Sequence, residues 1–288
     1  MVAETLTRIA EFTIDGITQG LVLALLGLGI TIVFGLGGVL NLSIGVFAFL
    51  GVIVALELLG ITGNLLVSAV LAVAIVTLFG LVVDKSLLSL VYRSEGEERI
   101  LLGIFVTLGL AIFLDGLLFI SYPSSYSLSF GIPSTTIAGV QIRGSSIGII
   151  LISTVILTAL YLFFSRTYLG GATRTVMQDE TGAVLCGISP RKMRTFVFAL
   201  SVAIAAIAGI LYSTTQSVYA ATGFELTILA LIVSIVGGVT SIVGAVVAGL
   251  ALGIIATFTS AYVGAYVAEI ALFAVAVIAL LLQPEEIA

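Results

Sequence analysis

The chain has 288 residues, of which 60% are hydrophobic and only 9% are charged, and its formal net charge is −5. Soluble domains carry about 25% charged residues, so most of this surface must face lipid instead of water, and a soluble enzyme is excluded. The chain has only ten Lys and Arg residues against fifteen Asp and Glu residues, and they form no basic stripe, which excludes a nucleic-acid-binding protein. The absence of His excludes His-based catalytic and metal sites.

The apolar runs are continuous and rich in Leu, Ile, Ala and Gly, a pattern typical of membrane helices and not of an outer-membrane barrel. A spanning helix needs about 20 mainly apolar residues. The sequence therefore predicts an all-α polytopic membrane protein, one transmembrane domain over 1–288, with about eight or nine transmembrane or half-spanning helices. These are 14–35, 42–59, 64–83, 99–120, 146–165, 195–214, 225–238, 242–261 and 265–283. Segment 225–238 is too short to cross alone unless it is a half-helix.

The first twelve residues, MVAETLTRIAEF, lack the basic region and the cleavage site of a secretory signal. They are expected to form a short interfacial helix that leads into the first span.

Glycine pairs beside polar side chains mark two segments, GGVLNLSIG (37–45) and GGVTSIVG (237–244). Small residues let helix backbones approach closely, so tight packing is one interpretation. The other is a break in each membrane helix, of the kind that forms a solute path in transporters.

Four acidic residues lie inside apolar segments: Glu57, Asp115, Glu225 and Glu269. We expect them to be solvated near the external ends of their helices, and a proton or cation pathway is the alternative.

Basic residues predict the orientation. Eight of the ten fall in the loops after the third and fifth spans, namely Lys85, Arg93, Arg99, Arg166, Arg174, Arg191, Lys192 and Arg194. The positive-inside rule makes these loops cytoplasmic, so the N-terminus is predicted outside and the C-terminus inside.

Two loops are long. Segment 121–145 holds two prolines and many Ser and Thr residues, and it is expected to be an ordered external loop, either a connector or a docking surface for an external partner. Segment 166–194 is the most polar stretch, and a cytoplasmic helix pair with Pro190 as a stop is the simplest interpretation.

No motif supports catalysis, because the chain contains no G-x-x-x-x-G-K-[ST], H-E-x-x-H or G-x-S-x-G sequence. An uphill transporter of this kind needs a coupled ion or an ATPase on another chain.

Three blocks are informative in this order and spacing: residues 16–45, in which Asn41 opens the second span and Gly45 follows, TLGLAIFLDGL (107–117) and GGVTSIVGAVVAGLALG (237–253). They resemble the shorter permease subunit of Liv-type ABC importers, which take up branched-chain and other hydrophobic amino acids. The resemblance runs from about Gly16 to Pro284. Ile44 departs from it, because the family usually has a polar residue there.

With this resemblance, a translocation path is predicted along Asn41, Ser43, Gly45, Thr107, Gly109, Gly237, Gly238 and Ser241. Unpaired polar groups in lipid cost several kcal/mol, so each polar side chain should face protein or a water-filled lumen. The alternative for Asn41 and Ser241 is that both only cap helices.

The resemblance also implies a role for 166–194. ABC importer permeases carry an E-A-A sequence, followed three residues later by Gly, that docks on the ATPase. TGAVLCG (181–187) has this spacing, with Thr181 in place of the Glu and Glu180 just before it. Gln178 also fits the Liv-type version. The expected ATPase-coupling residues are Arg174, Asp179, Glu180, Ala183 and Gly187. Cys186 lies in the same segment and is expected to be a small apolar filler.

The resemblance implies half of a heteromeric pore in the cytoplasmic membrane. Its partners would be a second permease, cytoplasmic ATPase subunits, an external solute-binding protein, the amino-acid substrate and membrane lipid. The chain itself would be no enzyme and would need no cofactor or metal, because its partner subunits use the ATP. The alternatives are an ABC permease for urea or short amides, an ion-coupled secondary carrier, and a channel or structural membrane protein.

Overall fold

A computed structural model describes residues 2–94, 96–137 and 139–282, most of which are helical. The helices are α1 (Val2–Gly37), α2 (Ile44–Thr62), α3 (Leu65–Val83), α4 (Ser89–Val91), α5 (Gly96–Ser121), α6 (Gly144–Arg166), α7 (Tyr168–Gln178), α8 (Glu180–Leu185), α9 (Pro190–Tyr212), α10 (Thr222–Gly237), α11 (Ile242–Tyr262) and α12 (Ala265–Leu282). A π-helical turn, η1 (Asp84–Leu88), joins α3 to α4. The strands β1 (Thr135–Ile137) and β2 (Val140–Ile142) form an antiparallel hairpin.

Eight helical stretches in the described part of the chain are long and apolar enough to cross a membrane. The exception among the predicted spans is α10, whose 16 residues fall short of the roughly 20 that a crossing needs. The predicted all-α polytopic fold is confirmed. Gln283 and Pro284, where the last predicted span and the family resemblance end, lie outside the described residues.

The expected interfacial helix at the N-terminus does not exist as a separate element. α1 is one helix of 36 residues that includes both this segment and the first span. No Gly or Pro precedes Gly16, so no residue in the first fifteen favours an end to the helix. At 1.5 Å per residue, α1 is about 54 Å long, well beyond the ~30 Å hydrocarbon core of a bilayer.

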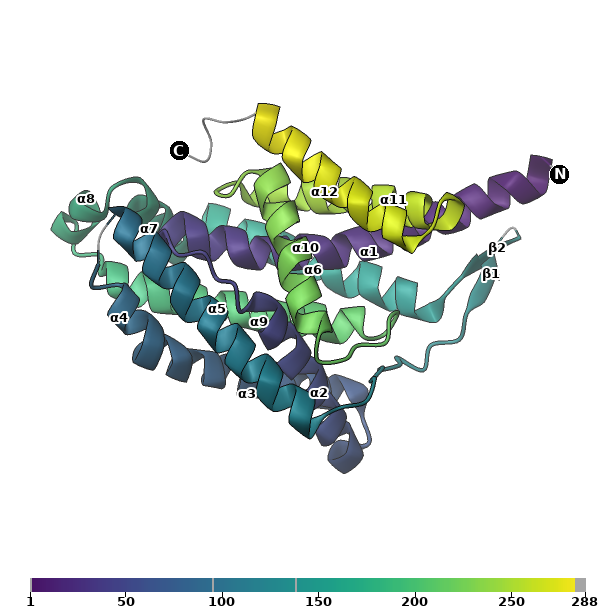
Figure 1. The fold of residues 1–288 in the computed structure, drawn as a ribbon, viewed down its shortest axis with the longest axis horizontal. Coiled ribbons are helices and arrows are strands. Elements are labelled where there is room, and N and C mark those ends of the chain that lie inside the picture. The colour runs from purple at the N-terminus through teal and green to yellow at the C-terminus, as the bar shows by residue number, and fades with distance from the viewer. Residues whose placement is uncertain (1, 95, 138, 283–288) are drawn as a thin grey trace.

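α1 runs along the long axis of the molecule and packs mainly against α11 and α9 (Figure 1). Glycines let α1 and α11 meet at backbone distance, because a Cβ on Gly20 would lie 2.8 Å from the Leu250 Cα and one on Gly249 would lie 2.6 Å from the Ala24 Cα. We call this contact, made by Gly16, Gly20, Ala24, Gly249 and Gly253, the α1–α11 seam. Close approach of this kind is how helices associate where lipid removes the hydrophobic driving force.

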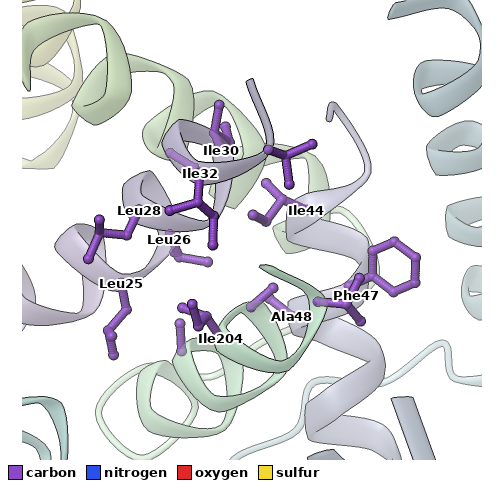
Figure 2. Close-up of a cluster of buried hydrophobic side chains, with 14 of the residues drawn as sticks. Leu25, Leu26, Leu28, Ile30, Ile32, Ile44, Phe47, Ala48 and Ile204 are labelled. Carbon is purple, nitrogen blue, oxygen red and sulfur yellow. The ribbon is translucent and has the colours of Figure 1, made fainter. Parts of the chain in front are cut away.

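Large aliphatic side chains of α1 form the centre of the core together with α2 and α9. Figure 2 shows residues 25–32 of α1 facing Ile44, Phe47 and Ala48 of α2 and Ile204 of α9. Each labelled side chain is at most 5% exposed. Ser201 of α9 adds a polar tie, since its hydroxyl donates to the Gly29 carbonyl at 2.7 Å.

The outer helices show the opposite pattern. In the most apolar window of α12 only 17% of residues are buried, against 83% in α1. Large side chains such as Phe105, Phe113 and Leu151 are more than half exposed. These faces are suited to contact lipid or another membrane subunit.

The two long loops lie at opposite ends of the long axis (Figure 1). The β1–β2 hairpin lies beside the beginning of α1, and the predicted helix pair, α7 and α8, lies at the other end. The expected pair is confirmed, but the role of Pro190 is not. α8 already ends at Leu185, and Pro190 is the first residue of α9, where its missing N–H costs nothing.

Candidate translocation and coupling sites

The break between α1 and α2 is buried and fastened to α5. Asn41 and Ser43 are 0% exposed, and the Asn41 Oδ1 accepts from the Ser43 N–H at 3.1 Å and from its hydroxyl at 2.6 Å. The Thr107 hydroxyl accepts from the Leu42 N–H at 3.1 Å, and its one proton is shared between the Gly103 carbonyl of its own helix at 2.7 Å and the Leu40 carbonyl at 3.1 Å. Thr107 thus bonds backbone groups of the linker between α1 and α2, which no helix pairs. The Asn41 Nδ2 has no partner among the described residues.

Gly45 marks the place where α2 crosses α10. Its N–H donates to the Thr227 hydroxyl at 3.0 Å, and that hydroxyl also bonds the Gly223 carbonyl at 3.1 Å. A Cβ on Gly45 would overlap the Gly223 carbonyl oxygen. Thr227 is a site residue that the sequence reasoning missed; a hydroxyl inside an apolar half-helix was the available signal.

The break between α10 and α11 is a tight turn. Gly237 and Gly244 approach so closely that no Cβ fits on either residue, and Gly238 has φ +86°, a conformation that favours glycine. Ser241 is the N-cap of α11, and its hydroxyl accepts from the Gly244 N–H at 3.0 Å.

The structure therefore groups the predicted path residues into three places. Asn41, Ser43 and Thr107 lie together; Gly45 lies at the α2–α10 crossing; and Gly237, Gly238 and Ser241 lie at the α10–α11 turn. Gly109 lies apart on the exposed face of α5, with no atom within 4 Å of an added Cβ. That these residues line a path stays a prediction.

Three of the four intramembrane acids are exposed near helix ends. Glu57 accepts from the Tyr122 hydroxyl at 3.2 Å, and Glu225 accepts from the Tyr219 hydroxyl at 2.8 Å. Asp115 is only partly exposed and differs from the other three at one carboxylate oxygen. Its Oδ1 is buried without a hydrogen-bond partner among the described residues, because α5 packs it against Gly223 at the α2–α10 crossing.

The coupling segment is a capped helix–turn–helix. Asp179 ends α7 and caps α8, since its Oδ1 accepts from the Thr181 N–H at 2.9 Å. Ala183 is fully buried, and Gly187 ends the turn after α8 with φ +78°. The outer face of α8 is apolar, with Val184 56% and Leu185 84% exposed. Cys186 is exposed there as well, so its interpretation as a packed filler is wrong.

Glu180 turns toward its own subunit. Its carboxylate accepts from the Arg194 guanidinium of α9 at 2.6 Å and lies 3.6 Å from that of Arg99 at the start of α5. Only 5% of the Arg194 side chain is exposed, and its guanidinium carbon lies 5.3 Å from the centre of the Tyr92 ring. Burial raises the pKa of the Tyr92 hydroxyl, so the ring stays neutral beside the guanidinium. Glu180 therefore joins α8 to α5 and α9.

Arg174 of α7 lies away from this cluster and shares a surface hollow of about 230 Å³ with Ser241. Thr31 of α1 and Tyr161 of α6 line the same hollow. The structure thus brings a predicted coupling residue beside a predicted path residue, at the α10–α11 turn.

A second cavity, of about 250 Å³, lies between residues 12–22 of α1, the beginning of α6 and the ends of α9 and α11, toward the hairpin end of the molecule. Asp15, Gln19 and Arg143 line it, and none of them was singled out as a site residue. The signal was present but weak: Asp15 is a carboxylate just inside the predicted span 14–35, and Arg143 precedes the predicted span 146–165.

Comparison with known proteins gives a consistent result. Residues 12–282 match the family model described as "Branched-chain amino acid transport system / permease component". The chain is 28% identical, over 94% of its length and 92% of the relative, to the high-affinity branched-chain amino acid transport system permease protein LivH of Escherichia coli (strain K12). It is 27% identical, with the same coverage, to the permease protein BraD of Pseudomonas aeruginosa.

An archaeal relative is also similar. The probable branched-chain amino acid transport permease protein LivH of Methanocaldococcus jannaschii is 31% identical over 81% of this chain and 75% of the relative. Among solved structures, PsaBC from Streptococcus pneumoniae in complex with Fab matches with a TM-score of 0.53 at 14% identity, covering 97% of this chain and 95% of that one. This last likeness concerns the fold alone.

Proposed function

Since the chain belongs to the branched-chain amino acid transport system permease component family, we propose that it is one permease subunit of an ATP-driven importer for branched-chain or other hydrophobic amino acids. The observation that carries the proposal is the match over residues 12–282, which includes every predicted span but for the last residue of the final one. ATP hydrolysis is assigned to separate cytoplasmic subunits.

The α7–α8 pair supports the coupling role. A six-residue helix held by an Asp179 cap and by the Glu180–Arg194 ion pair can act as a rigid lever between an ATPase and the spanning helices. Its exposed Val184 and Leu185 offer an apolar surface to that ATPase. Because the Glu180 carboxylate is engaged inside the subunit, we assign it to positioning α8 and not to direct contact with the ATPase.

The proposed orientation places α7 and α8 in the cytoplasm and the β1–β2 hairpin outside. The loops with eight of the ten basic residues support it through the positive-inside rule. A solute-binding protein would then deliver the amino acid at the hairpin end, and ATP binding inside would switch the pore, shared with a second permease, from inward-facing to outward-facing.

Reconstituted transport tests this function. Liposomes that contain the chain, a second permease and the ATPase subunits should take up labelled L-leucine only when ATP is inside and the binding protein outside. Uptake that needs no ATP, or preference for urea over leucine, would contradict the proposal.

Gly187→Leu tests the coupling segment in the same assay. A side chain in the φ +78° conformation strains the turn and extends from it into the docking surface, so ATP-driven uptake should fall at least tenfold.

Gly63→Leu is the matched control for this variant. Gly63 ends α2 with φ +64° and also has open space around an added Cβ, so the backbone strain is similar. Its uptake should stay within about twofold of wild type. Equal losses in both variants would assign the effect to folding and remove the coupling role from Gly187.

A further inference from the structure

The cavity at the hairpin end combines opposite charges with a mostly polar lining and a few apolar side chains, in a chain that is only 9% charged. Asp15 contributes a carboxylate from α1, and Arg143 contributes a guanidinium from the beginning of α6. Phe12, about one turn before Asp15 on α1, and Val22, about two turns after it, line the same space. The cavity therefore offers an anionic group, a cationic group and apolar surface within about 250 Å³.

The two charged groups lie near each other without forming a hydrogen bond. The Arg143 nitrogen and the Asp15 Oδ2 are 3.8 Å apart, beyond the 2.7–3.2 Å of an N–H···O bond. By comparison, Arg194 and Glu180 in the same molecule form a hydrogen-bonded ion pair at 2.6 Å. Asp15 and Arg143 are 33% and 64% exposed in their side chains, so both keep capacity for a further partner.

Uncharged polar groups complete the wall. The Gln19 Oε1 accepts from the Thr257 hydroxyl at 3.1 Å, and this bond joins α1 to α11 in the cavity wall. The Ser146 hydroxyl approaches the Asp15 Oδ1 at 3.5 Å. Ser146 of α6 therefore lies next to the Asp15 carboxylate in the cavity.

Aromatic rings extend the apolar part. The Phe12 ring packs edge-on against Phe258 and Tyr262 of α11, with ring centres 6.1 and 5.9 Å away. This packing fixes one wall of the cavity, because a ring held by two others has little freedom to move.

We propose that this cavity is a receiving site for a zwitterionic amino acid with an apolar side chain, in which Arg143 binds the α-carboxylate and Asp15 the α-ammonium group. A net-neutral pair of opposite charges matches a zwitterion, and guanidinium suits a carboxylate because its planar fork can bind both oxygens. Phe12 and Val22 suit the apolar side chain. The inference rests on the proposed function, since it places the site at the end where the binding protein would release its solute.

Binding to the full chain in lipid nanodiscs tests the site, with L-leucine as the probe and saturation-transfer NMR as the measurement. Asp15→Asn and Arg143→Gln should each weaken leucine binding at least tenfold. Arg143→Lys keeps the charge without the fork and should fall between Arg143→Gln and wild type. L-Leucinamide lacks the carboxylate and should bind wild type at least tenfold more weakly than leucine. Monodisperse elution shows that each variant is folded.

Two control variants separate binding from support of the hairpin. Glu11 lies one turn before Asp15 and accepts from the Gln141 N–H of β2 at 2.9 Å, so Glu11→Ala loosens the hairpin without entering the cavity. Arg8→Gln removes a charge from the same helix outside the cavity wall. Both should bind leucine within twofold of wild type.

The proposed site is wrong if the wild-type chain shows no saturable leucine binding, or if leucinamide binds as well as leucine. It is also wrong if Glu11→Ala loses as much leucine binding as Arg143→Gln. ATP-driven leucine uptake by the complete wild-type assembly is measured in parallel. If uptake is normal while the cavity does not bind leucine, only this inference fails; if the assembly takes up no leucine, the proposed function fails.

Discussion

The two helix breaks of this chain look alike in sequence and differ in structure. The break between α1 and α2 is buried and bonded to a third helix through Thr107, and Gly45 then locks α2 against α10. The break between α10 and α11 makes its cap locally, through Ser241, and Ser241 lies at the surface beside Arg174 of α7.

A break held by residues from distant parts of the chain cannot change shape without disturbing three helices. The cap of the second break is local, although α10 and α11 on either side of it also contact α1, through the bond between the Ser234 and Thr31 hydroxyls and through the α1–α11 seam. We therefore call the first break, which Thr107 bonds to α5, the fixed joint, and distinguish it from the second by the local cap at Ser241.

The largest effect is expected from Gly45→Ala at the fixed joint. The new Cβ would overlap the Gly223 carbonyl oxygen and lie 2.6 Å from the Thr227 hydroxyl, so α2 and α10 must separate. The loss of folding free energy should reach about 3 kcal/mol or more, the upper end for an overpacked site. Thermal unfolding in detergent measures it.

Gly109→Ala is the control for this variant, because an added Cβ on that exposed helical glycine has no atom within 4 Å. It should be neutral or stabilising by about 0.5–1 kcal/mol. Equal stability of the two variants would show that the α2–α10 crossing is not a close contact.

Thr107→Val should have the next largest effect. The substitution keeps the shape but leaves the Leu42 N–H without its acceptor, which costs about 1–3 kcal/mol for a buried group. Thr77→Val in α3 is the matched control, since among the described residues the Thr77 hydroxyl bonds the Val73 carbonyl of its own helix and no other group. Unfolding midpoints that shift equally in both variants would mean that Thr107 does not fasten the first break.

Ser241→Ala should have the smallest effect. It removes an N-cap from the second break and should cost about 1 kcal/mol, while Ser241→Thr, which keeps an acceptor oxygen, should cost less. Uptake per folded molecule, measured beside stability, distinguishes the two interpretations of this residue. A changed rate or substrate range supports a place on the path, whereas an unchanged rate limits Ser241 to capping.

Hydrophobicity and charge were enough to predict the spans, the short α10 and the α7–α8 pair, because each depends on a local run of residues. The two breaks were also visible, since glycine beside Asn41 and Ser241 is unusual in an apolar segment. The length of α1 was not predicted correctly. A change from polar to apolar composition near Phe12 suggested an element boundary, but helical propensity continues through it.

Side-chain partners could not be predicted from sequence, because they join residues far apart in the chain. Thr107 reaches Leu40 and Leu42 across more than sixty positions, and Arg143 meets Asp15 across 128 positions, the difference between their numbers. Glu180 looked available for an ATPase, but Arg194 on the next spanning helix binds it. Which of several charged side chains pairs with a given residue depends on the fold.

The glycines of the α1–α11 seam should tolerate fewer substitutions during evolution than ordinary buried positions do. A glycine codon is one nucleotide change from an alanine codon, yet alanine at Gly20 or Gly249 would place a methyl group against the backbone of the other helix. No change at a neighbouring side chain can make room, since backbone and not side chain occupies the space. Selection should therefore preserve these glycines in descendants of this gene, and an engineer who replaces helical glycines by alanine to gain stability should leave the seam untouched.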